Sequence, residues 1–538
     1  MKKINIACII FSVLMASGCY KDKGNYDYTD IKRVEIQFDK ISSYTITQGD
    51  VLEVNPIYPD FVLANPDNYE FTWYLNEETR PEWNTMNFKW QINDLMERGS
   101  LVIEVRDKST DVKYMNRANV TVNGVYTNYY SWMILSDDGG KSKLSFLSVN
   151  ALLDPDSADQ PQGSDQYYYD GERFITNVYN GDLGSGPIAL QEHWREGIDW
   201  SETVVGNVCV FQKSGAVDLE GTGFTKEIDM VDAFVGQKYP ASNTVLYPGS
   251  FIEYADVVCD QDGKLYSRLK LSASVYNSEY FLQSPLKVSG EDEVLENCTV
   301  CRGYYTSNRF GYQVVYDGKN KRFLYFQDGG SNYDAPAEGA SGIVPVKVDS
   351  KLYLEDVVHL DNHNGYELLH LCQSAATGAG WSSYYGFNEV LREESSDKLF
   401  LQQFILTKKY GADSPDIQSI TKKEIKGLPG IPSVMAFPTY NPTEYAFFAI
   451  GKKLYMVDLV NMSDAELYYE FDSDITAMDY GSSSNIHLAV GLEDGSFFVL
   501  GANAAKNIKD EHKLVYKAPE KVGKIVDIKY KNNSMWNY

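Results

Sequence analysis

The chain has 538 residues, of which 43% are hydrophobic and 23% charged, so it can bury a large core and is neither disordered nor fibrous. Its 49 Lys and Arg against 75 Asp and Glu give a net charge of −26, which repels phosphate backbones and excludes nucleic acid as a favourable partner. The 41 Tyr and 14% aromatic content favour strands over helices. The composition indicates a strand-rich globular protein and names no reaction.

Residues 1–18 predict a lipoprotein signal peptide. The chain opens on MKK, and residues 4–15 form an apolar run that is too short to cross a bilayer as a stable helix. The small residues at 16–18 directly precede Cys19 and resemble a bacterial lipobox, although Ala stands where Leu is usual. We expect cleavage before Cys19, acylation of its thiol, and a polar tether over 19–30; the alternative is an ordinary secretory signal that contains a cysteine. Each buried lipid methylene contributes about 0.8 kcal/mol, so a multiply acylated cysteine anchors firmly.

Residues 31–123 predict one small β-sandwich. Strand-like runs separated by turn residues recur about every ten positions, which is typical of such folds. The runs are Val34–Gln37, Ser43–Ile46, Leu52–Ile57, Glu70–Leu75, Phe88–Ile92, Ser100–Arg106 and Ala118–Val122. Trp73 has the position of a buried core tryptophan, and the disulfide of antibody domains is missing from the pattern. We therefore expect an Ig-like sandwich without that bridge.

Residues 125–538 contain a recurring hairpin of two short apolar strands around a tight turn. The turns fall near 139, 214, 262, 318, 395, 451 and 494, and several are Asp-Gly, which supplies the positive φ of a two-residue turn. A further strand recurs at 434–437, 476–480 and 526–530, at the period of about 40–50 residues typical of a propeller blade. We predict a seven-bladed β-propeller closed by pairing of the C-terminal strand with the first hairpin. The alternative is a stack of further sandwiches.

Together these segments resemble a known family. The lipobox cysteine, the tether YKDKGNYDY, the sandwich strands GSLVIEVRD and NVTV, and the segment SWMILSDDGGKSKLSF are similar to the PKD-like family of Bacteroidetes lipoproteins. The resemblance implies an accessory lipoprotein of an outer-membrane nutrient uptake system, partnered by a TonB-dependent transporter and a SusD-like protein. It implies capture of a glycan, glycopeptide or peptide at the cell surface or facing the periplasm, and it brings no catalytic residues.

Cysteines and histidines form no recognisable metal or redox motif. Cys298 and Cys301 form a C-x-x-C without the following helix of a thioredoxin site, so structural cysteines are expected, with a local disulfide as the alternative. His359 and His363 are spaced i, i+4, with His370 further on, but they span a strand end and a loop and lack the Glu of H-E-x-x-H. No metal, cofactor or catalytic residue is predicted.

Two other features of the sequence bear on enzymatic activity. Ser136-Asp-Asp138-Gly-Gly-Lys-Ser142 fits the Asp-box of sialidase-like propellers, in which the Asp and Ser hold a hairpin turn, and we interpret it as a structural turn. The many carboxylates do not reveal a pair suited to glycoside hydrolysis, because spatial proximity decides that question. A surface hydrolase or lyase acting on a glycan remains the alternative function.

Aromatic residues in long Gly/Ser-rich segments are the predicted ligand-binding residues. They are Trp194, Trp200, Trp381, Tyr384 and Tyr385. Aromatic rings stack on the apolar faces of sugars, and propeller loops commonly carry binding residues. We expect a non-enzymatic binding or assembly protein that uses these loops; the alternative role for the rings is packing against the protein itself.

Overall fold

The structure, a computed structural model, is all-β, and the chain divides into two compact units, Met1–Asn123 and Gly124–Tyr538. The described residues are 33–38, 43–126, 131–148, 152–153, 167–168, 174–193, 206–251, 255–269, 280–288, 290–301, 312–328, 341–345, 356–374, 383–408, 416–438, 445–481, 487–502 and 514–531. In these residues no helix is long and apolar enough to span a membrane. The helical segments among the described residues are short and lie in the first unit: α2 (Asp60–Ala64), η1 (Pro66–Asn68) and η2 (Pro81–Trp83).

The described residues of the first unit form six strands in two sheets. They are β1 (Ser43–Thr47), β2 (Val51–Val54), β3 (Tyr69–Leu75), β4 (Phe88–Gln91), β5 (Met96–Asp107) and β6 (Lys113–Asn123). One sheet has the order β1-β6-β5-β3, with β1 parallel to β6, and the other pairs β2 with β4. Trp73 is fully buried and its Nε1–H donates to the Thr85 carbonyl at 2.9 Å, so the indole both fills the core and has a partner. The run at 34–37 forms no strand; it contributes a single bridge between Gln37 and Ile57.

The second unit contains seven sheets among its described residues, here called I to VII. Sheet I has the order β11 (Phe174–Ile175), β8 (Lys141–Leu147), β7 (Ser131–Asp138), β35 (Lys524–Lys531). Sheet II runs β12 (Pro187–His193), β13 (Asn207–Gln212), β14 (Val217–Leu219), β15 (Lys226–Asp229), and sheet III runs β16 (Leu246–Phe251), β17 (Ala255–Asp260), β18 (Leu265–Leu269). Sheet IV runs β19 (Cys298–Val300), β20 (Tyr312–Asp317), β21 (Arg322–Asp328), β22 (Ser341–Pro345).

The remaining sheets repeat the same up-and-down order. Sheet V runs β23 (Tyr366–Ser374), β24 (Ser383–Glu393), β25 (Leu399–Lys408), β26 (Asp416–Ile425). Sheet VI runs β27 (Val434–Ala436), β28 (Tyr445–Ile450), β29 (Lys453–Asp458), β30 (Glu466–Glu470), and sheet VII runs β31 (Ile475–Tyr480), β32 (His487–Leu492), β33 (Phe497–Gly501), β34 (Leu514–Lys517). A separate short pair joins β9 (Leu152–Leu153) to β10 (Tyr167–Tyr168).

All seven predicted hairpins are present, one in each sheet. The first joins β7 to β8 through Gly139 and Gly140, whose φ values of 62° and 90° require glycine or a strained residue. The predicted pairing of the C-terminal strand is also present: β35 runs antiparallel to β7, with Ile528 opposite Ile134. Residues 394 positions apart in the sequence therefore share one sheet, and the pairing with β35 gives β7 partners on both sides.

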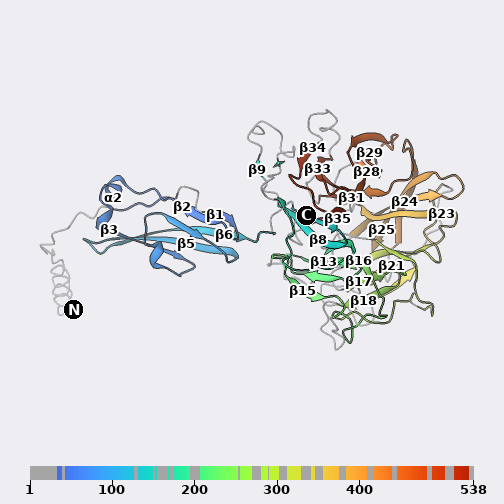
Figure 1. Cartoon of the computed structure of the whole chain (residues 1–538), viewed down its shortest axis with the longest axis horizontal. Coiled ribbons are helices and arrows are strands. Elements are labelled where there is room, and N and C mark those ends of the chain that lie inside the picture. The colour runs from blue at the N-terminus through green and yellow to red at the C-terminus, as the bar shows by residue number, and fades with distance from the viewer. Residues whose placement is uncertain are drawn as a thin grey trace, which may run out of the picture. The chain divides into compact units, whose positions relative to one another are not determined.

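Successive sheets pack face to face through apolar clusters. In β7, Trp132 and Ile134 join a cluster with sheet VII, while Met133 and Leu135 join a cluster with sheet II. Further clusters join sheets II and III, III and IV, IV and V, V and VI, and VI and VII. Because side chains alternate across a strand, a strand between two sheets must be apolar on both faces, which explains the continuous apolar runs in the sequence. Figure 1 shows strands β16, β31 and β35 near the middle of this unit and strands β15, β18 and β34 at its edge.

Candidate functional site

The second unit holds a cavity of about 440 Å³ lined by one strand from each of five sheets, here called the inner-strand cavity. Its lining comes from β19, β23, β27, β31 and β35, together with the residues next to them. The lining residues are spread along the sequence from Thr299 to Lys529, so segments far apart in the chain meet there. The cavity is thus a product of the tertiary arrangement, since no two of these strands belong to one sheet.

Charged groups in the inner-strand cavity also join neighbouring sheets. Lys529 Nζ lies 3.4 Å from Asp479 Oδ1, and both side chains keep partial exposure, at 21% and 11%. The other carboxylate oxygen of Asp479 accepts the Tyr530 N–H at 2.8 Å, which links sheet VII to sheet I. Asp527 accepts the Leu190 N–H at 2.8 Å and links sheet I to sheet II. The cavity therefore offers an ammonium group and carboxylates whose positions are held by backbone hydrogen bonds.

Uncharged groups complete the lining. The imidazole of His370 stacks on Phe437, with ring centroids 5.4 Å apart and planes 21° from parallel. Thr476 Oγ1 donates to the Ile525 carbonyl at 2.6 Å. Burial raises the pKa of the Tyr480 hydroxyl well above its usual range, so this residue stays neutral. A small molecule with both polar and apolar groups suits such a wall.

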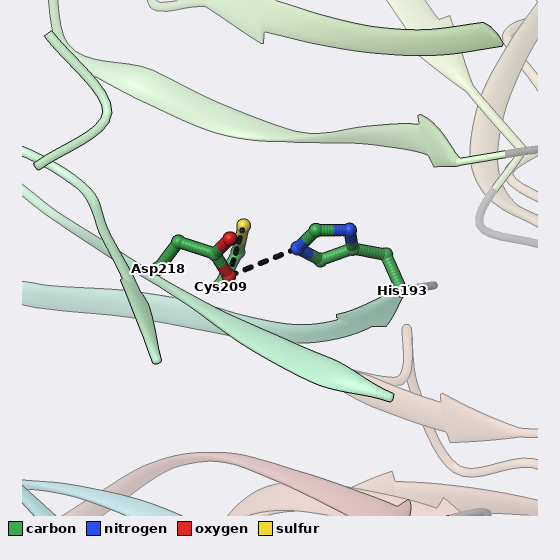
Figure 2. Close-up of side chains that lie close together, drawn as sticks. All are labelled: His193, Cys209 and Asp218. Carbon is green, nitrogen blue, oxygen red and sulfur yellow. Dashed lines mark hydrogen bonds and ion pairs between the residues drawn. The ribbon is translucent and has the colours of Figure 1, made fainter. Parts of the chain in front are cut away.

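A second polar cluster is buried between sheets II and III, where Figure 2 shows His193, Cys209 and Asp218 directed toward one another from β12, β13 and β14. His193 Nε2 lies 2.9 Å from Asp218 Oδ1, and the Cys209 thiol lies 3.6 Å from the same oxygen. Burial raises the pKa of the Asp218 carboxyl, but its interactions with His193, Asn207 and Arg268 together outweigh burial, and the pKa is lowered overall. Burial raises the pKa of the Cys209 thiol well above its usual range. These are the residues of the described chain whose spacing could hold a metal ion.

The structure describes few of the predicted binding residues. Trp194, Trp200 and Trp381 lie outside the described residues, and so does the predicted lipidation residue Cys19. Tyr384 and Tyr385 belong to β24, paired with Thr407 and Leu406 of β25, and only their backbone is described. Ligand binding by these five aromatic residues stays a prediction.

The two cysteines of the C-x-x-C do not share one site in the structure, and neither do the clustered histidines. Cys298 and Cys301 are free thiols; Cys298 packs between sheets III and IV and Cys301 between sheets IV and V. His363 Nε2 lies 3.0 Å from Glu389 Oε2 in a fully buried pair, whereas His370 lines the inner-strand cavity. The i, i+4 spacing therefore does not create a common site, because these residues are not on a helix.

The Asp-box segment forms the β7–β8 turn with a different hydrogen bond from the one expected. Asp137 Oδ1 accepts the Gly140 N–H at 2.6 Å, so the carboxylate that holds the turn is Asp137 rather than Asp138. The hydroxyls of Ser136 and Ser142 are buried and have no hydrogen-bond partner among the described residues. In β7, Asp137 precedes the two turn glycines, and this position places its side chain beside the Gly140 amide.

Comparison with curated protein sequences finds no match. Among solved structures, the computationally designed Ika8 protein is 9% identical, with 75% of this chain and 92% of that chain covered and a TM-score of 0.33. Apo AztD from Citrobacter koseri is 10% identical, with coverages of 86% and 97% and a TM-score of 0.34. BBS1N in complex with ARL6DN is 12% identical, with coverages of 62% and 88% and a TM-score of 0.31. These scores are too low to carry an argument.

The match to a known family concerns the N-terminal part of the chain. Residues 19–179 match the model of the PKD-like family, a range that takes in the first unit and continues into sheet I. The sandwich of β1 to β6 with its buried Trp73 lies inside this range. The chain therefore carries a PKD-like domain at its N-terminus, within an all-β protein.

Proposed function

We propose that this protein is a lipid-anchored binding protein whose second unit is a closed seven-bladed β-propeller with its ligand site in the inner-strand cavity. Cys19 carries the lipid, and the protein acts in an outer-membrane nutrient uptake system that captures a glycan or peptide. Its partners in this proposal are a TonB-dependent transporter and a SusD-like protein. It faces the cell surface or the periplasm.

The packing of sheets I to VII supports the closed propeller. Each sheet shares an apolar cluster with the next, and sheet VII shares one with sheet I. The pairing of β35 with β7 adds the last strand of the chain to the sheet of the first hairpin. Closure of this kind leaves no sheet edge exposed at the seam, which protects against edge-to-edge aggregation.

The inner-strand cavity is the observation that carries the binding function. Its volume of about 440 Å³ lies in the range of roughly 300–1,000 Å³ that is usual for small-molecule sites. The Lys529 ammonium, the Asp479 carboxylate and the His370 ring supply charge, hydrogen bonds and a stacking surface. These groups suit a sugar residue or the end of a short peptide, whose faces combine polar and apolar patches.

The carboxylates of the cavity favour binding over glycan hydrolysis. A glycosidase needs two carboxyl groups that flank the scissile bond, one of them able to donate a proton. Asp479 and Asp527 instead accept backbone N–H bonds from neighbouring sheets, so each carboxylate already has an oxygen engaged as a hydrogen-bond acceptor. They act as fixed acceptors in this proposal.

Binding and turnover can be separated on the purified protein. Glycan and short-peptide arrays should reveal saturable binding without release of reducing ends or new amino termini. Lys529→Ala and His370→Ala should each weaken binding at least tenfold, whereas Lys452→Ala, which removes an exposed lysine paired with Glu470, should leave it unchanged. Turnover that is lost in Asp479→Asn would instead establish the hydrolase alternative, and equal binding by all variants would exclude the cavity as the site.

A further inference from the structure

The cluster of His193, Cys209 and Asp218 lies apart from the residues of the inner-strand cavity and on one face of sheet II. In β13 the neighbours of Cys209, Val208 and Val210, pack toward sheet I, so Cys209 points to the opposite face. Asp218 is directly opposite Cys209 in the β13–β14 register. His193 ends β12, opposite Asn207, which places it diagonally from Cys209 on the same face. Three different donor types thus converge from three adjacent strands.

The distances between the donor atoms approach those of a metal site. Zinc bonds of about 2.0–2.3 Å to nitrogen, oxygen and sulfur place tetrahedral ligand atoms roughly 3.3–3.8 Å apart. The Cys209 thiol and Asp218 Oδ1 lie 3.6 Å apart, His193 Nε2 and Asp218 Oδ1 lie 2.9 Å apart, and all three donors lie within 4.8 Å of one another. An ion bound by all three side chains requires the imidazole to move away from Asp218. Met230 Sδ, 3.9 Å from the Cys209 sulfur, is a further donor at the edge of the cluster.

Charge balance favours a divalent ion. The side chains of His193 and Asp218 are 0% and 3% exposed, and Cys209 is also buried, so water cannot compensate an isolated charge there. A thiolate and a carboxylate together carry two negative charges, which a divalent cation neutralises. The neighbouring Arg268 and Asp256 already form their own ion pair, at 2.8 Å. Thiolate, imidazole and carboxylate are the ligand types that zinc prefers.

Another buried histidine pair in the same unit shows what a purely hydrogen-bonded arrangement looks like. His363 bonds one oxygen of Glu389 at 3.0 Å, and the second oxygen accepts the Gln402 amide at 2.7 Å. The third side chain of that arrangement is the Gln402 amide, which does not bind a metal tightly. The third side chain beside Asp218 is the Cys209 thiol. His363 is therefore a matched control for His193.

We propose that His193 Nε2, Cys209 Sγ and an oxygen of Asp218 bind one Zn²⁺ ion that joins β12, β13 and β14 beside sheet III. Binding releases the Cys209 thiol proton to solvent. The proton that His193 Nε2 donates to Asp218 moves to Nδ1, which has no hydrogen-bond partner among the described residues, so that Nε2 and the Asp218 oxygen become ligands of the same ion. This inference is independent of the ligand that the inner-strand cavity takes.

Metal content tests the proposal directly. The full-length protein, purified without a metal-affinity tag or chelator, should contain one zinc per chain by mass spectrometry of the elements. After unfolding and refolding with Co²⁺, it should show a thiolate-to-cobalt charge-transfer band. Folded Cys209→Ala and Asp218→Asn proteins should contain less than a tenth of the zinc, whereas His363→Gln should keep the full amount.

Three results would overturn the proposal. They are a wild-type protein that takes up no zinc when refolded with Zn²⁺, uptake of copper but not zinc, and full zinc content in a folded Cys209→Ala protein. Circular dichroism checks the fold of each variant. Should Cys209→Ala fail to fold, the cobalt spectrum of the wild-type protein decides, because a missing charge-transfer band excludes the thiolate as a ligand.

Discussion

The contact between sheet VII and the C-terminal strand can be tested at Gly491. A Cβ atom added to this residue of β32 would lie 2.4 Å from Ile525 Cγ2 and 3.0 Å from Ile528 Cδ1, both on β35. Ile525 is fully buried and cannot turn into solvent, so Gly491→Ala overpacks the contact and should lower the free energy of unfolding by about 1–3 kcal/mol. Ile525→Ala removes Cγ2, the nearest obstructing atom, but keeps the Cβ at 2.9 Å, and should by itself cost about 2–5 kcal/mol.

The double mutant decides whether the two residues meet. With alanine at both positions, the new methyl group at 491 occupies part of the space that Ile525 leaves. The loss of stability should therefore be smaller than the sum of the single losses by about 0.5–3 kcal/mol. Urea unfolding, monitored by circular dichroism, gives the free energy of unfolding of the two single mutants and the double mutant. The transition to compare is the one that Ile525→Ala shifts. Gly430→Ala, where an added Cβ meets nothing within 4 Å, serves as the control.

Additive losses, within about 0.5 kcal/mol, would refute the contact between β32 and β35 and with it the packing of sheet VII on sheet I. If Gly491→Ala changes the free energy of unfolding no more than Gly430→Ala does, the contact between β32 and β35 is also refuted. Since domains are stable by only about 5–15 kcal/mol, either predicted single loss is large enough to measure.

Three further outcomes are expected. Burial lowers the pKa of His487 to about 4, so the unfolded chain binds the proton first as the pH falls, and stability should drop by about 3 kcal/mol between about pH 6.5 and 4. The His487→Gln protein should lack this part of the profile in urea unfolding, and an unchanged profile would contradict burial as its cause. Because the thiols of Cys298 and Cys301 are free, reducing agent should leave the melting temperature of the protein unchanged, and a drop would reveal a disulfide. Cys19→Ser should abolish incorporation of labelled palmitate and release the protein from membranes; a membrane-bound variant would argue against the lipid anchor.

Local chemistry explains how much of the fold could be predicted from the sequence. The hairpin turns depend on neighbouring residues, such as Gly139 and Gly140 with their positive φ, so each could be located without knowing what surrounds it. The pairing of β35 with β7 followed from counting strands, because the first hairpin lacked an inner strand and the last strand lacked a hairpin. The prediction that residues 34–37 form a strand was wrong, because this segment makes one isolated bridge rather than a ladder of hydrogen bonds.

The candidate sites depend on which face each side chain takes, and this information is hidden in strands that are apolar throughout. Trp132 and Met133 are adjacent and equally buried, yet they pack against different sheets. The alternation of side chains along a strand does not by itself show that Cys209 and Asp218 share a face. That conclusion also needs the register of β13 against β14. His370 and Lys529 reach one cavity from strands of different sheets. The sequence by itself thus determined the turns and most of the strands, which arise from local preferences, whereas the lipid anchor stays a prediction. Only the tertiary structure decided which distant side chains meet, because that depends on register and on the packing of one sheet against the next.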